Sequence, residues 1–211
     1  KVVLPSTIKF IREYSFSGDT KLNDIRTRTL NGGAEGVTAN GELGGDVIVI
    51  GSHAFANCKK LAKINLSKIT SIGYRGFEYC TSLTEVNLGT LRNTGKEAFK
   101  DCSALTTVIT NEHTKLSYAM FVRTGLKEIT LYTKTEIPEY CFARCGSLTK
   151  VTLKNSLETI GKGALSDCNN LSSFVFDGAT VSTAGEQAFY NDSSLKAFDL
   201  PDCEVKFGAN R

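Results

Sequence analysis

A repeating pattern of apolar residues runs through almost the whole of this 211-residue chain. One copy consists of Ile50, Phe55, Cys58, Leu61, Ile64 and Leu66, and twenty-two residues later the same pattern returns as Ile72, Phe77, Cys80, Leu83, Val86 and Leu88. A fixed period of this length predicts a solenoid, because one unit cannot bury its own apolar side and must stack on copies of itself.

Eight copies can be counted from the position that phenylalanine usually occupies. They are Phe16, Phe55, Phe77, Phe99, Phe121, Phe142, Leu165 and Phe189. We therefore expect one elongated domain over residues 1–211, with about eight repeats of 21–24 residues. Both ends of the chain stop within the pattern, as expected for a fragment of a longer array.

Two periodicities separate within each repeat. Residues 63–67 alternate apolar and polar, which predicts a short strand, whereas Ala54, Phe55 and Cys58 in segment 51–60 have helical spacing. Glycine recurs where the coil would turn into that helix, at positions 51, 73, 95, 161 and 185. The pattern predicts an α/β fold with a parallel sheet on the concave face and short helices behind it, with strands at about 63–67, 85–89, 107–111, 128–132, 150–154 and 173–177.

The combined pattern Ile-Gly-x-x-Ala-Phe-x-x-Cys-x-x-Leu-x-x-Ile-x-Leu resembles the BspA-type leucine-rich repeats of bacterial and some protist surface proteins. The turn from Leu4 to Ile8 also resembles that family's Ile-Pro-x-x-Val segment. The resemblance implies a curved solenoid in a secreted or surface-anchored protein, with a role in adhesion or host interaction. It implies no shared catalytic residues.

Five of the seven cysteines share one position of the repeat: Cys58, Cys80, Cys102, Cys145 and Cys168. Equivalent side chains in stacked coils are parallel and about 5 Å apart. That geometry misses the Cβ separation of about 3.8 Å that a disulfide requires. We expect reduced, buried thiols that pack as small hydrophobic groups.

Composition excludes several classes of function. The net charge is +3, no run of lysine and arginine exceeds two residues, and no apolar stretch approaches the length of a membrane span. These features argue against nucleic-acid binding and against membrane insertion of this segment. No C-x-x-C pair occurs and the two histidines are isolated, so we expect neither a metal site nor a cofactor.

One insertion interrupts the repeat, at about residues 29–46. It contains six glycines together with Glu35, Glu42 and Asp46. The simplest interpretation is a flexible surface loop, since loop entropy grows slowly with length. A flap over the binding face and an acidic calcium loop are alternatives, although the acids lack the regular spacing of calcium ligands.

The outward positions of the strands form the natural binding surface of a solenoid. Charged and hydrogen-bonding groups are densest at Lys63, Asn65, Glu85, Asn87, Glu128, Tyr132, Lys150 and Lys154. Mixed charge favours a protein or glycoprotein partner, with host extracellular matrix as one candidate. Oligomeric state is not predicted.

Catalysis has little support in the sequence. We expect His53 at the surface and His113 half-buried, with no nucleophile near either. Glu85 and Glu128 share a face at a separation that loosely suits an inverting glycosidase, but an open sheet neither excludes water nor raises a carboxyl pKa.

The sequence therefore predicts a non-enzymatic binding module of an extracellular or cell-surface protein, which mediates adhesion through its concave sheet. A passive stalk that projects another domain is the alternative. An apolar or single-sign patch on the sheet would favour binding, and an unpatterned hydrated face would favour the stalk.

Overall fold

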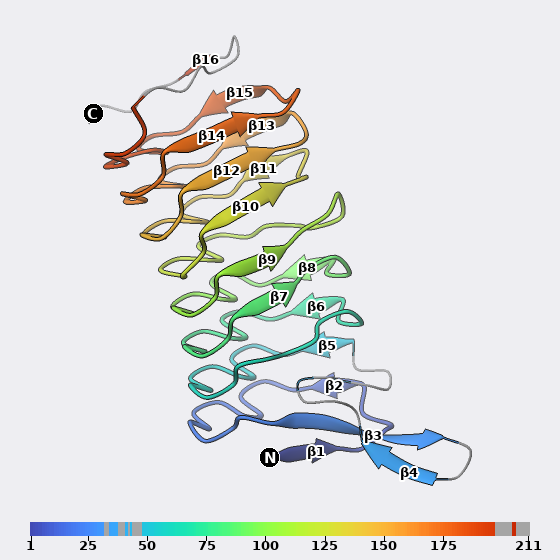
Figure 1. Cartoon of the computed structure of the whole chain (residues 1–211). Helices are drawn as coiled ribbons and strands as arrows, with labels where there is room; N and C mark the ends of the chain where they lie inside the picture. The colour runs from blue at the N-terminus through green and yellow to red at the C-terminus, as the bar shows by residue number, and fades with distance from the viewer. Residues whose placement is uncertain (32–33, 38–40, 42, 44–47, 197–203, 206–211) are drawn as a thin grey trace.

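The computed structural model describes residues 1–31, 34–37, 41, 43, 48–196 and 204–205. The chain forms an elongated stack of coils, with residues 2–4 at one end and residues 181–184 near the other (Figure 1). The described residues contain sixteen strands and no helix. Accordingly, nothing in these ranges has the length and apolar character of a membrane-spanning helix.

Seven strands lie along one side of the stack and form what we call the first-sheet column (Figure 1). They are β1 (Val2–Leu4), β3 (Ile25–Asn31), β7 (Glu85–Asn87), β9 (Thr107–Ile109), β10 (Glu128–Leu131), β12 (Lys150–Leu153) and β14 (Ser173–Phe176). All pairings between them are parallel. Five of the six predicted strands are confirmed, but at 63–67 only Asn65 forms a bridge. The predicted single sheet is divided into separate ladders, one of which is β10-β12-β14.

A second-sheet column, which the repeat pattern did not predict, runs behind the first (Figure 1). Its strands are β2 (Phe10–Ile11), β5 (Val49–Ile50), β6 (Ser71–Ile72), β8 (Asn93–Thr94), β11 (Glu136–Ile137), β13 (Leu157–Ile160), β15 (Val181–Ala184) and β16 (Glu204–Val205). Every pairing in it is parallel. Most of these strands contain two residues, which is too short to show an alternating pattern.

The predicted short helices are wrong: stacked turns occupy their place. In segment 51–60, Ala56 N–H donates to the carbonyl of His53 within the coil at 3.1 Å, whereas Phe55 N–H donates to Gly76 of the next coil at 2.8 Å. An α-helix would satisfy these donors within one segment. Ala54, Phe55 and Cys58 all point into the core from the stacked turns, and their spacing is the same as that of one face of a helix. Periodicity alone therefore could not distinguish stacked turns from a helix.

Each stacked turn contains two residues with left-handed backbone. The first position holds Tyr14, His53, Arg75, Glu97, Ala119, Tyr140, Gly163 and Gln187, and the second holds Gly18, Asn57, Tyr79, Asp101, Arg123, Arg144, Asp167 and Asn191. A regular right-handed helix cannot pass through such residues. The described residues contain eight such pairs, and we call this side of the stack the turn edge.

The sequence suggested that the recurring glycines provide unusual backbone angles, but none of the five has a left-handed φ. They serve close packing instead. A Cβ added to Gly73 would lie 2.4 Å from the backbone nitrogen of Ser52, and one added to Gly95 would lie 2.3 Å from the carbonyl carbon of Gly73. Because backbone atoms cannot move away as a flexible side chain could, these glycines are required for the close approach of neighbouring coils.

A ladder of phenylalanines occupies the centre of the core, as predicted. Adjacent rings of Phe16, Phe55, Phe77, Phe99, Phe121 and Phe142 are stacked with centroids 5.1–5.7 Å apart. Leu165 continues the column and is fully buried. The final member, Phe189, is only partly buried and lies edge-on to Phe174 at 5.3 Å.

The insertion is partly built into the fold. Strand β4 (Ala34–Val37) pairs with β3 as an antiparallel hairpin. Gly41 bridges two coils, since its N–H donates to Ile25 at 2.9 Å and its carbonyl accepts from Asn65 at 2.7 Å. Leu43 is buried in the core. The flexible-loop interpretation is therefore wrong for these residues, and the remaining insertion residues, with the flap and calcium alternatives that concern them, lie outside the described residues.

Candidate functional site

The eight predicted binding residues lie on or beside the first-sheet column. Seven of them are exposed and Tyr132 is half-buried: Lys63, Asn65, Glu85, Asn87, Glu128, Tyr132, Lys150 and Lys154. Strand register places Glu128 beside Lys150 on β10 and β12. Glu85, Asn87, Glu128 and Lys150 lie in strands that pair with neighbouring coils, so this part of the surface is largely preorganised.

Three of these residues have local partners. The side-chain oxygen of Asn65 accepts the backbone N–H of Ser67 at 2.9 Å, and that of Asn87 accepts the N–H of Gly89 at 2.9 Å. Lys154 forms an exposed ion pair with Asp177, and the carboxylate raises the pKa of the lysine through a hydrogen bond and its charge. The two asparagines therefore have a structural role in closing turns.

A nearly neutral stripe runs along the middle of this surface. It contains Ile109 on β9, Thr130 on β10, Thr152 on β12 and Val175 on β14. Ile109 is 43% exposed, and the other three are partly exposed. Parallel register aligns the last three directly. We call these four residues the central stripe, and charged residues such as Glu128 and Lys154 lie on its two sides.

The turn edge contains aromatic residues that the sequence analysis did not single out. Six of the seven tyrosines lie there: Tyr14, Tyr74, Tyr79, Tyr118, Tyr140 and Tyr190. Tyr14 stacks on His53 at 4.9 Å between ring centroids, and Arg75 lies over the ring of Tyr74 at 4.8 Å. Counting tyrosines by repeat position would have found this concentration.

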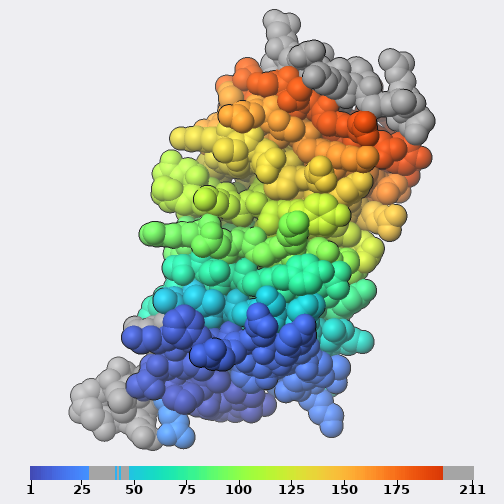
Figure 2. All heavy atoms as spheres, turned by 180° about the vertical axis from the view of Figure 1, so that it is seen from behind, coloured from blue at the N-terminus to red at the C-terminus, as the bar shows by residue number. Residues whose placement is uncertain are grey.

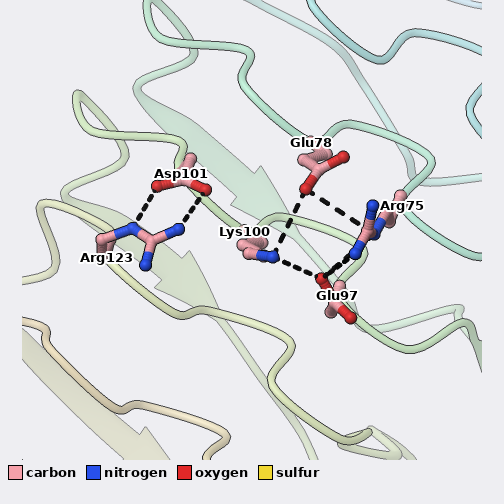
Figure 3. A network of polar contacts seen from close by, with 6 residues as sticks. All are labelled: Arg75, Glu78, Glu97, Lys100, Asp101 and Arg123. Atoms are coloured by element: carbon pink, nitrogen blue, oxygen red, sulfur yellow. Dashed lines mark hydrogen bonds and ion pairs between the residues drawn. The ribbon is translucent and has the colours of Figure 1, made fainter.

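Ion pairs link successive coils on the same edge (Figure 3). Glu97 accepts hydrogen bonds from Lys100 at 2.6 Å and from Arg75 at 3.1 Å, and Glu78 lies 3.6 Å from both cations. Burial alone would raise the pKa of Glu97, but the hydrogen bonds and charges of Lys100 and Arg75 outweigh it and lower that pKa. These charges are already satisfied within the fold.

A second pair lies beside this network. Arg123 contacts Asp101 of the preceding coil through two nitrogens, and the Nη2–Oδ2 distance is 2.8 Å (Figure 3). The hydrogen bond to Asp101 raises the pKa of Arg123. Both residues occupy the second left-handed position of their turns, so the repeat itself places the opposite charges together.

The predicted buried thiols are confirmed for Cys58, Cys80, Cys102, Cys145 and Cys168, and Cys141 is also free and buried. Each of the five donates to the carbonyl of the phenylalanine one coil earlier, with an Sγ–O distance of 3.1 Å. Burial raises the pKa of Cys58 to about 12, and it also raises the pKa values of Cys80 and Cys102. Thiols in this state are poor nucleophiles and poor metal ligands.

Asp192 occupies the cysteine position in the last described repeat. Its Oδ1 accepts the N–H of Cys168 at 2.8 Å, but Oδ2 has no hydrogen-bond partner among the described residues. Burial raises the pKa of this carboxyl to about 7, and the charge of Asp167 acts in the same direction.

Neither histidine is placed as the sequence suggested. His113 is exposed, 3.7 Å from Glu112, whereas His53 is half-buried between Tyr14 and Tyr74. Among the described residues, no group of three histidine, cysteine or acidic side chains could hold a metal ion.

The parallel coils and their buried ladders define a leucine-rich repeat solenoid. The chain belongs to the BspA-type leucine-rich repeat family. The model of that family, described as "BspA type Leucine rich repeat region", matches six copies over residues 39–145 and 120–210. No curated protein sequence matches the chain.

Solved structures of bacterial proteins have the same fold. A leucine-rich repeat protein from T. pallidum is 23% identical, with a TM-score of 0.57 over 95% of this chain and 78% of that one. A leucine-rich cell surface protein from Faecalibacterium prausnitzii A2-165 is 15% identical, with a TM-score of 0.54 over 100% of this chain and 79% of that one. A leucine-rich repeat protein from Eubacterium ventriosum is 21% identical, with a TM-score of 0.55 over 95% of this chain and 54% of that one.

Proposed function

We propose that this chain is a non-enzymatic, protein-binding module of a bacterial cell-surface or secreted protein, and that it mediates adhesion through the outer face of the first-sheet column. Membership of the BspA-type family and the cell-surface description of the F. prausnitzii protein support this location. The observation that carries the binding role is the central stripe, with Ile109 43% exposed at one end. A weakly polar centre between charged margins is the usual anatomy of a protein interface.

The chemistry of the surface fits a protein or glycoprotein partner. The central stripe supplies an isoleucine, a valine and two threonines, which lose little solvation when covered. Charged residues at its margins, such as Glu128 and Lys150, orient the partner more than they add affinity. Rigid strands limit the ordering entropy lost on binding. Affinity at one site is expected to be modest, and arrays on a cell surface would increase it through avidity.

The predicted binding residues differ in whether their side chains already have partners within the fold. Asn65 and Asn87 already cap turns, and Lys154 is paired with Asp177. Binding is therefore concentrated on Glu128, Tyr132 and Lys150 together with the central stripe. Tyr132 is the aromatic anchor of this surface: it is half-buried beside the central stripe, and tyrosine is enriched among the residues that dominate interface energies.

Immobilised extracellular-matrix glycoproteins provide the test. Tyr132→Ala combined with Lys150→Glu should weaken binding about tenfold or more, since it removes the anchor on one margin of the central stripe and reverses a charge on the other margin. Tyr190→Ala combined with Lys59→Glu is the matched control, because it makes the same chemical changes on the turn edge. Equal weakening by both variants would refute the sheet face as the binding surface.

A passive stalk remains the alternative function. Its support is the turn edge, where neighbouring coils are joined by ion pairs that leave few unsatisfied charges. Failure of the unmodified chain to bind any of the glycoproteins would favour this alternative.

A further inference from the structure

The edge opposite the turns contains a polar groove that crosses four successive coils. It lies along the loops that connect the first-sheet column to the second-sheet column, on the right-hand side of the stack in Figure 1. Its volume is about 880 Å³. The lining residues are Ser67, Lys68, Thr70, Gly89, Thr90, Arg92, Glu112, His113, Thr114, Lys115, Thr133, Lys134 and Thr135. We call this feature the loop-edge groove.

The charge of the groove has one dominant sign. Lys68, Arg92, Lys115 and Lys134 are exposed, and no ion pair within the described residues includes any of them. Glu112 is the only acidic residue of the lining, and it lies 3.7 Å from His113. Each of the four coils therefore presents one cation, at an interval of about 4.8 Å along the stack. The net charge of +3 gave no sign of this column of cations. A search for basic runs also missed it, because the four cations are far apart in sequence.

Asparagine side chains brace two residues of the lining, Gly89 and His113. Asn111 donates its amide to the carbonyl of Gly89 at 2.9 Å and accepts the backbone N–H of His113 at 2.9 Å. Asn87 accepts the N–H of Gly89 at 2.9 Å. Because Gly89 has no side chain, the groove stays open where these bonds meet, and a Cβ there would lie 3.0 Å from Asn111 Nδ2.

We propose that the loop-edge groove binds an acidic polysaccharide, one that carries sulfate or carboxylate groups, at a site separate from the sheet face. Four unpaired cations attract the charges of such a polymer, and the hydroxyl of Thr135 can exchange hydrogen bonds with its sugar hydroxyls, while that of Thr70, which donates to the carbonyl of Ile48, can accept one. The four coils span about 15 Å, which is long enough for several charges of one chain to bind together.

Other polyanions fit the groove less well. The lining holds no aromatic ring apart from His113, so it lacks the stacking platforms that bind single-stranded nucleic acids. The lining also includes no leucine, isoleucine, valine, methionine or phenylalanine that could form a pocket for a peptide side chain. Backbone groups at this edge are already bonded between coils, as in the 2.9 Å bond from Arg92 N–H to Thr70, so a peptide gains no strand pairing here.

Titration with size-fractionated heparin oligosaccharides tests the proposal. Arg92→Glu combined with Lys115→Glu should lower affinity about tenfold or more, because it replaces two attractions by two repulsions. The matched control is Lys60→Glu combined with Lys127→Glu, which makes the same change in net charge at exposed positions outside the groove. That control should change affinity by about twofold or less. Equal weakening by both pairs would overturn the proposal in favour of non-specific attraction.

A milder variant and a second probe complete the test. Lys68→Gln combined with Lys134→Gln retains side-chain length, and it should reduce the slope of log affinity against log salt concentration by about 2. An unchanged slope would contradict binding in the groove. Poly-glutamate should bind more weakly than a heparin oligosaccharide of equal charge. Equal or tighter binding of the peptide would assign the groove to acidic proteins and overturn the polysaccharide proposal.

Discussion

The turn edge and the first-sheet face of this solenoid use charge in opposite ways. On the turn edge, Glu97 is bonded to Lys100 and Arg75 of its own and the preceding coil, and its side chain is only 13% exposed. On the sheet face, Glu128 and Lys150 lie beside each other in register and remain exposed. The contrast indicates that one edge holds the coils together while the other face is available to a partner.

The two surfaces also differ in how much their residues contribute to the core. The all-atom view from behind shows a continuous body in which successive coils follow one another without a break (Figure 2). Beneath the turn edge lies the phenylalanine ladder, whose inner members are fully buried. The outward residues of the sheet lie on top of the same core and contribute little to it. Substitutions should therefore separate stability from binding.

The largest effect is expected from a pair of truncations that compare the inside of the turn edge with the outside of the sheet. Phe99→Ala should lower the free energy of unfolding by about 3–5 kcal/mol, because it leaves a cavity between two stacked rings. Ile109→Ala, at a 43% exposed position, should cost about 1 kcal/mol or less. Chemical denaturation measures both. Similar losses would show that the sheet face is part of the core and would break the comparison.

A second prediction uses the buried carboxyl of Asp192, whose Oδ2 has no hydrogen-bond partner among the described residues. The folded-state pKa of Asp192 is raised to about 7, above its ordinary value near 3.8, so the folded chain binds a proton more readily than the unfolded chain does. Its contribution to stability is complete below the ordinary pKa and is lost as pH rises through about 7. Asp192→Asn should therefore gain stability relative to the parent between pH 5 and pH 8, by about 1–2 kcal/mol.

Thermal unfolding of the two proteins across that pH range measures this difference. Asp177→Asn on the sheet face is the control, because the pKa of Asp177 is lowered by the hydrogen bond and charge of Lys154 and does not titrate between pH 5 and pH 8. If the stability difference between Asp192→Asn and the parent is independent of pH, then the pKa of Asp192 is not raised in the folded chain.

Sequence alone predicted the repeat, its core ladders and the buried thiols, because each rests on a side chain that returns at a fixed interval. It failed where backbone hydrogen bonds decide the structure. Ala54, Phe55 and Cys58 have helical spacing, but the N–H of Phe55 bonds to Gly76 of the next coil, which a linear pattern cannot indicate. The two-residue strands such as β5 were too short to recognise. The function of the glycines, close packing of coils, also depends on contacts between coils.

The surfaces that we propose for binding were predicted less completely for a related reason. The outward strand positions follow from alternation, so Glu128 and Lys150 were placed on the sheet face correctly. The loop-edge groove combines Lys68, Arg92 and Lys115, whose positions within their loops differ from coil to coil. Since no fixed interval relates them, only the folded stack brings them together.

The smallest expected effect compares the two kinds of ion pair directly. Glu97→Gln keeps the size of the side chain but removes the charge that Lys100 and Arg75 share, and it should cost about 1 kcal/mol at neutral pH, since solvent screens part of the network. The pKa of Glu97 is lowered in the fold, so this contribution is present above the ordinary carboxyl pKa and disappears as pH falls through the lowered value. Denaturation at neutral and acidic pH should therefore show a loss for Glu97→Gln that shrinks on acidification. Asp177→Asn breaks the exposed pair with Lys154 and should leave the neutral-pH stability unchanged within error, because both partners face solvent. An equal loss in the two variants would mean that charge stabilises both surfaces alike, and the sheet face would then lose its distinction as the surface reserved for a partner.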